Sequence, residues 1–113
     1  MSRMPNNEVC IVEERKVRDY LLNTTRMPAA AKARFFLSCG FSDDDWRAFA
    51  NALKSHGKGH SVLNEVVSEY GTKYEIEGSL VCPDGRKPVI RTVWQIDRDE
   101  LAPRLITAYP AWK

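Results

Sequence analysis

Val89-Ile90-Arg91-Thr92-Val93-Trp94-Gln95-Ile96 is a run of mostly β-branched and aromatic residues, and Arg104-Leu105-Ile106-Thr107-Ala108-Tyr109-Pro110 is a second run of this kind. Such residues are enriched in β-strands, so the two segments predict two strands joined by a short acidic loop. Arg91, Thr92 and Thr107 interrupt the apolar pattern, which a strand that only fills a core does not need. We therefore expect these polar side chains to line either a working face or a polar rim of a sheet.

Two further strands are predicted upstream, over residues 62–70 and 72–81, because both segments alternate roughly every two residues around Gly71. In the second segment the apolar residues Tyr74, Ile76 and Leu80 fall on one face. The opposite face carries charged and hydroxyl residues: Lys73, Glu75, Glu77 and Ser79. Pro83-Asp84-Gly85-Arg86 then predicts a tight turn into the strand at Val89. This sheet has one buried and one solvated face.

Three helices are predicted before the strands. The first covers residues 13–22, and the second begins at Pro28 and ends near Ser38, because alanine is a strong helix former and proline is tolerated in a first turn. The third starts after Ser42 as its cap, with Asp45 at the capping-box position and an apolar stripe at helical spacing: Trp46, Phe49, Ala50 and Leu53. We expect residues 56–60 to end this helix, with Gly57 as a left-handed cap.

Helices followed by hairpin-linked strands predict an α+β fold, in which about three N-terminal helices pack on a mainly antiparallel, four-stranded C-terminal sheet. With 113 residues, the chain fits a single domain over 1–113. It divides into a loose leader (1–7), a helical part (13–56) and a sheet part (60–110), and residues 9–12 are a candidate short strand or staple.

Composition limits the function classes. Seventeen basic and fifteen acidic residues leave a net charge of +2, so any nucleic-acid site must be local. Cys10, Cys39 and Cys82 are widely spaced, without a Cys-x-x-Cys pair, and only two histidines are present. We therefore expect no metal site, no cofactor and a reduced cytoplasmic setting, with Cys39 and Cys82 as small buried side chains. No apolar run approaches the roughly 20 residues of a membrane span.

The candidate catalytic residues lie on the predicted solvated face: Lys73, Glu75, Arg91, Thr107 and Tyr109. If their strands are neighbours, cations, a carboxylate and hydroxyls converge there. Cleavage of RNA without a metal needs a base for the 2′-hydroxyl, an acid for the leaving oxygen and cations for the phosphate, and these residue types supply all three. The alternative is a set of ordinary cross-strand pairs on a wet sheet face.

A second set of residues is a candidate for binding RNA. Lys32 and Arg34 form a basic cluster beside two phenylalanines on the second helix, and His60 follows a Gly-Lys-Gly segment. The alternatives are the solvated face of a helix for the two cations and a structural role for the histidine. Trp112, near the C-terminal end of the sequence, is either folded back on the body or left for a partner.

Several motifs resemble a small bacterial family of uncharacterised domains that occur alone and at the ends of polymorphic toxins. They are Tyr20-Leu21-Leu22, Lys32-Ala33-Arg34-Phe35-Phe36, Gly71-x-Lys73-Tyr74, Pro83-Asp84-Gly85-Arg86, Arg91-Thr92-Val93-Trp94 and, most specific, residues 103–110. Proteins of this kind share a helices-then-sheet layout with the metal-independent ribonuclease toxins that include barnase and the RelE-type toxins. The resemblance implies RNA cleavage, a cognate antitoxin and roles for Lys32, Lys73, Arg91, Thr107 and Tyr109.

One position departs from this resemblance. Related sequences tend to have a histidine before the second helix, whereas residues 23–27 contain none. If that histidine carried the proton, this chain would be inactive, or Tyr109 or His60 would take its place.

Two hypotheses follow. The first is a cytoplasmic, toxin-type endoribonuclease with an RNA substrate and a cognate antitoxin. The second is a noncatalytic binding module, immunity-like or an adaptor, that uses the same sheet face and Trp112 to hold another protein.

Overall fold

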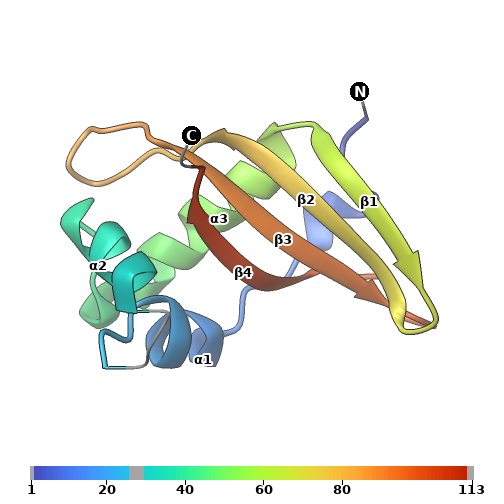
Figure 1. Ribbon diagram of the computed structural model, residues 1–113, viewed down its shortest axis with the longest axis horizontal. Coiled ribbons are helices and arrows are strands. Elements are labelled where there is room, and N and C mark those ends of the chain that lie inside the picture. The colour runs from blue at the N-terminus through green and yellow to red at the C-terminus, as the bar shows by residue number, and fades with distance from the viewer. Residues whose placement is uncertain (1, 26–29, 112–113) are drawn as a thin grey trace.

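The computed structural model of the chain describes residues 2–25 and 30–111. Its helical elements are η1 (Asn7–Val9), α1 (Glu14–Lys16), η2 (Val17–Leu21), α2 (Ala30–Ser38), η3 (Asp43–Asp45) and α3 (Trp46–Gly59). Its strands are β1 (Val62–Ser68), β2 (Gly71–Ser79), β3 (Val89–Asp97) and β4 (Arg104–Pro110). The predicted α+β fold, with helices first and strands after, is therefore confirmed (Figure 1).

The four strands form one antiparallel sheet in the order β1-β2-β3-β4. The β2–β3 register places Glu77 opposite Arg91, and the β3–β4 register places Arg91 opposite Tyr109. β4 carries a bulge opposite Val93 and Trp94. Gly71, with a φ of 140°, begins β2 where a Cβ atom would lie 2.2 Å from the carbonyl oxygen of Ile96, so only glycine fits this turn.

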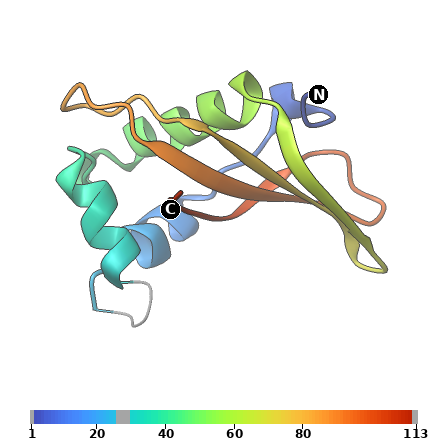
Figure 2. The ribbon, with the colours of Figure 1, turned by 45° about the horizontal axis from the view of Figure 1, so that its top comes forward.

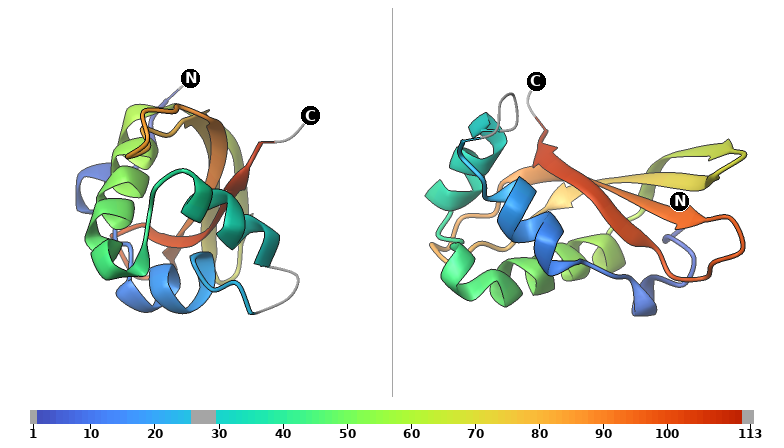
Figure 3. Two further views of the ribbon diagram at one scale, coloured as in Figure 1. Left: turned by 90° about the vertical axis from the view of Figure 1, so that its left-hand side faces the viewer. Right: turned by 90° about the horizontal axis from the view of Figure 1, so that it is seen from below.

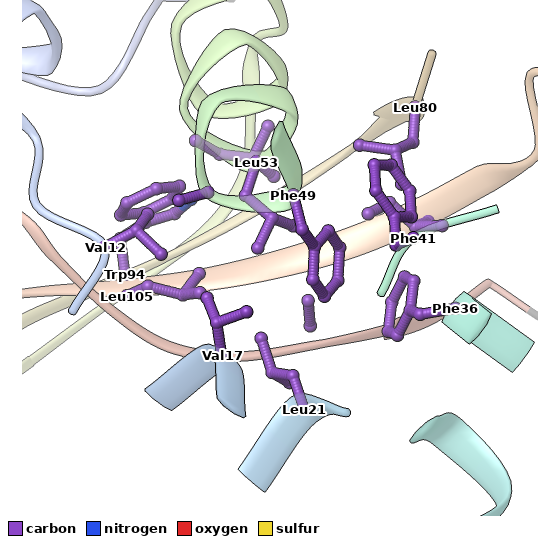
Figure 4. Packing of buried hydrophobic residues seen from close by; sticks show 14 of the residues in the cluster. Val12, Val17, Leu21, Phe36, Phe41, Phe49, Leu53, Leu80, Trp94 and Leu105 are labelled. Atoms are coloured by element: carbon purple, nitrogen blue, oxygen red, sulfur yellow. The ribbon is translucent and has the colours of Figure 1, made fainter. Parts of the chain in front are cut away.

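The helices cover one face of the sheet, as the turned views make clear (Figures 2 and 3). Side chains from α2, α3, η2 and the strands converge on one core, in which Phe36, Phe49 and Trp94 are fully buried (Figure 4). The sheet supplies Ile76, Ile90 and Leu105 to this core. The predicted alternation of β2 is thus confirmed, and the face that carries Glu75, Glu77 and Arg91 stays open.

The third helix confirms its predicted apolar stripe but differs at both ends. Asp45 is the N-cap, because its carboxylate accepts a hydrogen bond from the amide of Ala48 at 3.4 Å, whereas Ser42 precedes the short η3 turn. The expected left-handed cap at Gly57 is wrong, since the helix continues to Gly59. Gly57 instead allows α3 to approach β3 closely, because a Cβ atom there would lie 2.7 Å from Cζ2 of Trp94.

Thr92 was expected on a working face or a polar rim, and this expectation is wrong. Its side chain is fully buried between α3 and the sheet. The Trp94 indole donates a hydrogen bond to Thr92 Oγ1 at 2.8 Å, and His56 Nδ1 lies 3.0 Å from the same oxygen. His56 Nε2 faces the carbonyl oxygens of Gly78 and Ile90 at 3.0 and 3.2 Å, so it must carry the proton, and Nδ1 accepts from the threonine hydroxyl.

The N-terminal segment is not the loose leader that was expected. Met4 is buried in the core, and Ser2 accepts a backbone hydrogen bond from Val62. Ile11 forms a one-residue parallel bridge with Arg104, which fits the predicted staple. The first helix is shorter than predicted and continues as the π-helical turn η2, while Pro28 and Trp112 lie outside the described residues.

Two further expectations concern burial. Cys10, Cys39 and Cys82 are buried and unpaired, as predicted for Cys39 and Cys82. Within residues 2–25 and 30–111, no helix combines the length and the apolar character that a membrane crossing requires.

Candidate functional site

The open face of the sheet meets the helical layer at β4, where α2 and α1, which continues into η2, lie beside this edge strand (Figure 1). Lys32 of α2 is half-buried at this junction. Its ammonium nitrogen lies 3.1 Å from the Tyr20 hydroxyl and 3.3 Å from Thr107 Oγ1. It also lies 5.2 Å from the centre of the Tyr20 ring and 5.9 Å from that of Tyr109. Residues of two other elements, η2 and β4, therefore hold this lysine in one place.

Arg91 provides a second cation on the same face. Its Nε donates to Glu77 Oε1 at 2.8 Å, and the strand register places it between Glu77 and Tyr109. Hydrogen bonds with Glu77 and with Tyr109 raise the pKa of the Arg91 guanidinium, so it stays charged. Because one edge of the guanidinium is held by Glu77, the remaining N–H groups are left for Tyr109 and for a ligand.

Tyr20 belongs to the same cluster. Hydrogen bonds with Thr107 and with Lys32 lower the pKa of its hydroxyl, outweighing the effect of burial. The Lys16 ammonium lies 5.1 Å from the centre of the ring. A tyrosine beside two lysines loses its proton more readily than an isolated one, which is a property of proton carriers.

We call Tyr20, Lys32, Arg91, Thr107 and Tyr109, together with Glu77, the β4 cluster. It combines two fixed cations, two tyrosine hydroxyls and a carboxylate on a surface outside the buried core. Chemically, it can bind an anion between the cations and exchange protons with it.

The structure brings four of the predicted residues together in this cluster: Lys32, Arg91, Thr107 and Tyr109. Glu75 lies one row further along the open face, since it pairs with Val93, which pairs with Thr107. Lys73 pairs with Gln95 and is four residues from Glu77 on β2, or about 13 Å along the strand.

Arg34 and His60 lie elsewhere. Arg34 is exposed and sits two residues from Lys32, or about 200° around α2. The His60 ring packs against Gly78 on the helix side of the sheet, and its Nε2 bonds with the carbonyl oxygen of Ser79 at 3.0 Å. Neither side chain joins the β4 cluster.

Sequence reasoning missed Tyr20 and Glu77. Tyr20 shares the helical spacing of Val17 and Leu21, which are both buried, so spacing alone places it in their apolar stripe. Its hydroxyl was the available signal, because a tyrosine at the edge of a core needs a polar partner. The place of Glu77 can be predicted only when the strand register is known. The β2–β3 hairpin is centred on Asp84, and this register sets Glu77 opposite Arg91.

No cluster of three or more His, Cys, Asp or Glu side chains suited to a metal ion occurs in the described parts of the chain. The described side chains also include no buried polar atom without a hydrogen-bond partner. The β4 cluster is thus the group of charged and hydroxyl side chains from separate elements on which a functional proposal can rest.

Comparisons with known proteins add two findings. The sequence profile of a family described as a domain of unknown function, DUF6883, matches residues 3–112. The fold is similar to a chain of the contact-dependent growth inhibition toxin–immunity protein complex from Klebsiella pneumoniae 342, with a TM-score of 0.73 and 19% sequence identity over 95% of this chain and 97% of that chain. No curated protein matches the sequence.

Proposed function

Because the chain belongs to DUF6883, a family of domains of unknown function, its activity must be argued from its own residues, and we propose that it is a toxin-type endoribonuclease that needs no metal. The observation that carries this proposal is the β4 cluster. Lys32 and Arg91 come from different elements, and both lie against Tyr109 on the open face of the sheet. Two cations beside one tyrosine side chain suit a phosphodiester.

The proposed reaction uses the ribose of the substrate. The 2′-oxygen attacks phosphorus, the bond to the 5′-oxygen breaks, and a 2′,3′-cyclic phosphate and a 5′-hydroxyl end result. Thr107 and Lys32 lower the pKa of Tyr20, and its deprotonated phenolate takes the 2′ proton, while the protonated Tyr109 hydroxyl gives its proton to the leaving oxygen. Arg91 and Lys32 stabilise the charge that develops on the phosphate.

Three other residues support or modify this scheme. Thr107 orients both Lys32 and Tyr20. Glu77 holds the Arg91 guanidinium. Glu75 is the alternative base, because it lies in the adjacent row of the same face.

The similar fold supports a toxin-like or an immunity-like protein, because the matching chain belongs to a complex of the two. Its name describes a growth inhibition toxin with an immunity protein, and 19% identity limits the likeness to the fold. In a protein of this type, a cognate antitoxin or immunity protein is the expected partner, and it would cover the open face.

The test is incubation of the purified protein with total RNA in EDTA, read on a gel. We expect cleavage by the wild type, and its loss in Arg91→Ala and Tyr20→Phe, with Tyr109→Phe much slower. These variants should stay folded, because partly exposed ion pairs contribute only about 0–1 kcal/mol to stability. The matched control is Arg47→Ala, an exposed arginine on α3. No cleavage by folded wild-type protein would reject the proposal.

A noncatalytic binding module is the second candidate, and the exposure of β1 favours it. Val66 and Val67 are 52% and 72% exposed on opposite faces of this edge strand, and Tyr70 is 72% exposed beside it. Exposed apolar side chains on a strand at the edge of a sheet suit contact with another protein.

Growth of cells that express the chain without a partner separates the two functions. A catalyst slows growth, and Arg91→Ala restores it. A binding module leaves growth unchanged in both cases.

A further inference from the structure

The open face has a second polar feature, at the end furthest from α2 (Figure 1). A hollow there is formed by the β1–β2 turn, the end of β3 and the start of β4, and it is lined by Tyr70, Lys73, Gln95, Asp97, Arg98 and Arg104. Lys73, Gln95 and Arg104 occupy matched positions on three neighbouring strands, so they share one face. We call this hollow the distal hollow.

Two cations in the distal hollow are available for a ligand. Arg104 is not one of them, since its Nε and Nη2 contact the Asp97 carboxylate at 2.8 and 3.1 Å. These bonds lower the pKa of Asp97 and keep it ionised. By contrast, the side chains of Lys73 and Arg98 have no hydrogen bond or ion pair with any residue that the structure describes.

Carboxylates do not cancel this charge. Asp97 is neutralised by Arg104, and Glu69 is the other acidic residue among those that line the hollow. Lys73 and Arg98 therefore outnumber the remaining carboxylate, and the hollow favours an anion.

Tyr70 adds an aromatic surface next to these cations. It is 72% exposed, and its backbone is held next to the end of β3, because its carbonyl oxygen accepts a hydrogen bond from the amide of Arg98 at 2.9 Å. It contributes nothing to the buried core. An exposed aromatic ring beside two cations is the combination with which proteins hold single-stranded nucleic acid, by stacking on a base and pairing with phosphates.

The distance between the distal hollow and the β4 cluster suits one strand of RNA. Arg91 and Asp97 are six residues apart on β3, or about 20 Å. A stacked strand rises about 3.4 Å for each nucleotide, so about six nucleotides span this distance, and fewer do if the strand is extended. A ligand bound at Arg91 can thus reach the distal hollow along the open face.

We propose that Tyr70, Lys73 and Arg98 form a second subsite, which binds a base and phosphates of the same single-stranded RNA several nucleotides away from the cleaved bond. This inference rests on the proposed function and assigns Lys73 a place in substrate binding instead of at the reacting phosphate. It identifies the substrate as a single-stranded RNA segment long enough to reach both sites.

The test measures binding with RNA that cannot be cleaved. Fluorescent 2′-O-methyl oligouridines of three and nine nucleotides lack the attacking hydroxyl, so binding is separated from chemistry. We expect the wild type to bind the longer probe more tightly. Tyr70→Ala should weaken binding of the longer probe about fivefold or more, whereas Tyr70→Phe should not. For the longer probe, the slope of the logarithm of the binding constant against the logarithm of the salt concentration should be smaller by about 1.4 in the double variant Lys73→Gln/Arg98→Gln. We call this slope the salt slope.

The controls use the shorter probe and another pair of cations. Binding of three nucleotides should not change in any of these variants. Arg47→Gln with Lys58→Gln removes two exposed cations from α3, and it should leave the salt slope for the longer probe unchanged. The proposal is overturned if the Tyr70 and Lys73/Arg98 variants bind the longer probe like the wild type, or if the α3 control reduces the slope equally.

The outcome is independent of cleavage. If the variants lose binding of the longer probe but total RNA is never cut, the subsite stands and the nuclease proposal falls. If total RNA is cut in EDTA but the longer probe binds equally to all variants, the nuclease proposal stands and the subsite falls.

Discussion

Arg91 and Thr92 are adjacent in the sequence but belong to different parts of the molecule. Successive side chains of a strand point to opposite faces, so Arg91 joins the β4 cluster while Thr92 is buried under α3. Burial of the threonine is favourable because its hydroxyl both accepts from Trp94 and donates to His56. The polar residues of β3 thus serve two purposes, one in binding and one in stability.

His56 makes stability depend on pH. Burial lowers the pKa of its imidazole to about 4, whereas the pKa in the unfolded chain is about 6.5. Between these values the unfolded chain binds a proton that the folded protein does not. The contribution of His56 to the free energy of unfolding should therefore be constant above about pH 6.5 and should fall by about 1.4 kcal/mol per pH unit below it, until about pH 4.

Urea denaturation at pH 7.5, 6 and 5 measures this slope. His56→Gln isolates the contribution of His56, because its stability should change less with pH than that of the wild type. Equal slopes for both proteins would contradict the assignment.

At the scale of elements, α3 and β3 approach closely at Gly57. Gly57→Ala should destabilise the protein by about 1–3 kcal/mol, because the new methyl group would lie 2.7 Å from Trp94 and the two elements would have to move apart. Gly59→Ala is the matched control, two residues along the same helix, with no heavy atom within 4 Å of the added group. It should change stability by no more than about 1 kcal/mol. Thermal unfolding compares the two, and a neutral Gly57→Ala would refute the argument.

The elements themselves were predictable, since the apolar stripe of α3 and the alternation in β2 follow from local spacing. The role of Gly57 was not predictable. Glycine often ends a helix, but here the helix continues and the close approach of Trp94, from a strand distant in sequence, requires a residue without a side chain. The β4 cluster was predictable only in part. Lys32, Arg91, Thr107 and Tyr109 carry suitable chemistry, but the inclusion of Tyr20 and Glu77 depends on strand register and on the packing of η2 against β4.

At the scale of the whole molecule, the helices cover the sheet unequally. They pack on β2, β3 and β4, while the β1–β2 hairpin extends beyond them, as the view from below makes clear (Figure 3). No residue of β1 is buried. The β4 cluster therefore lies on the well-packed part of the molecule, and the distal hollow lies next to the projecting hairpin. A long ligand would contact both a rigid and a less constrained region.

The uneven coverage of the sheet by the helices predicts different rates of amide hydrogen exchange in β1 and β3. Amides of β1 should exchange through local opening, because little apolar surface is exposed when this edge strand separates, whereas β3 is hydrogen-bonded on both sides and should exchange only on global unfolding. Matched substitutions test the same point. Val67→Lys on β1 should change the free energy of unfolding by less than about 0.5 kcal/mol, but Ile76→Ala on β2 should cost about 2–5 kcal/mol. Equal protection of β1 and β3 would mean that the hairpin and the body unfold as one unit.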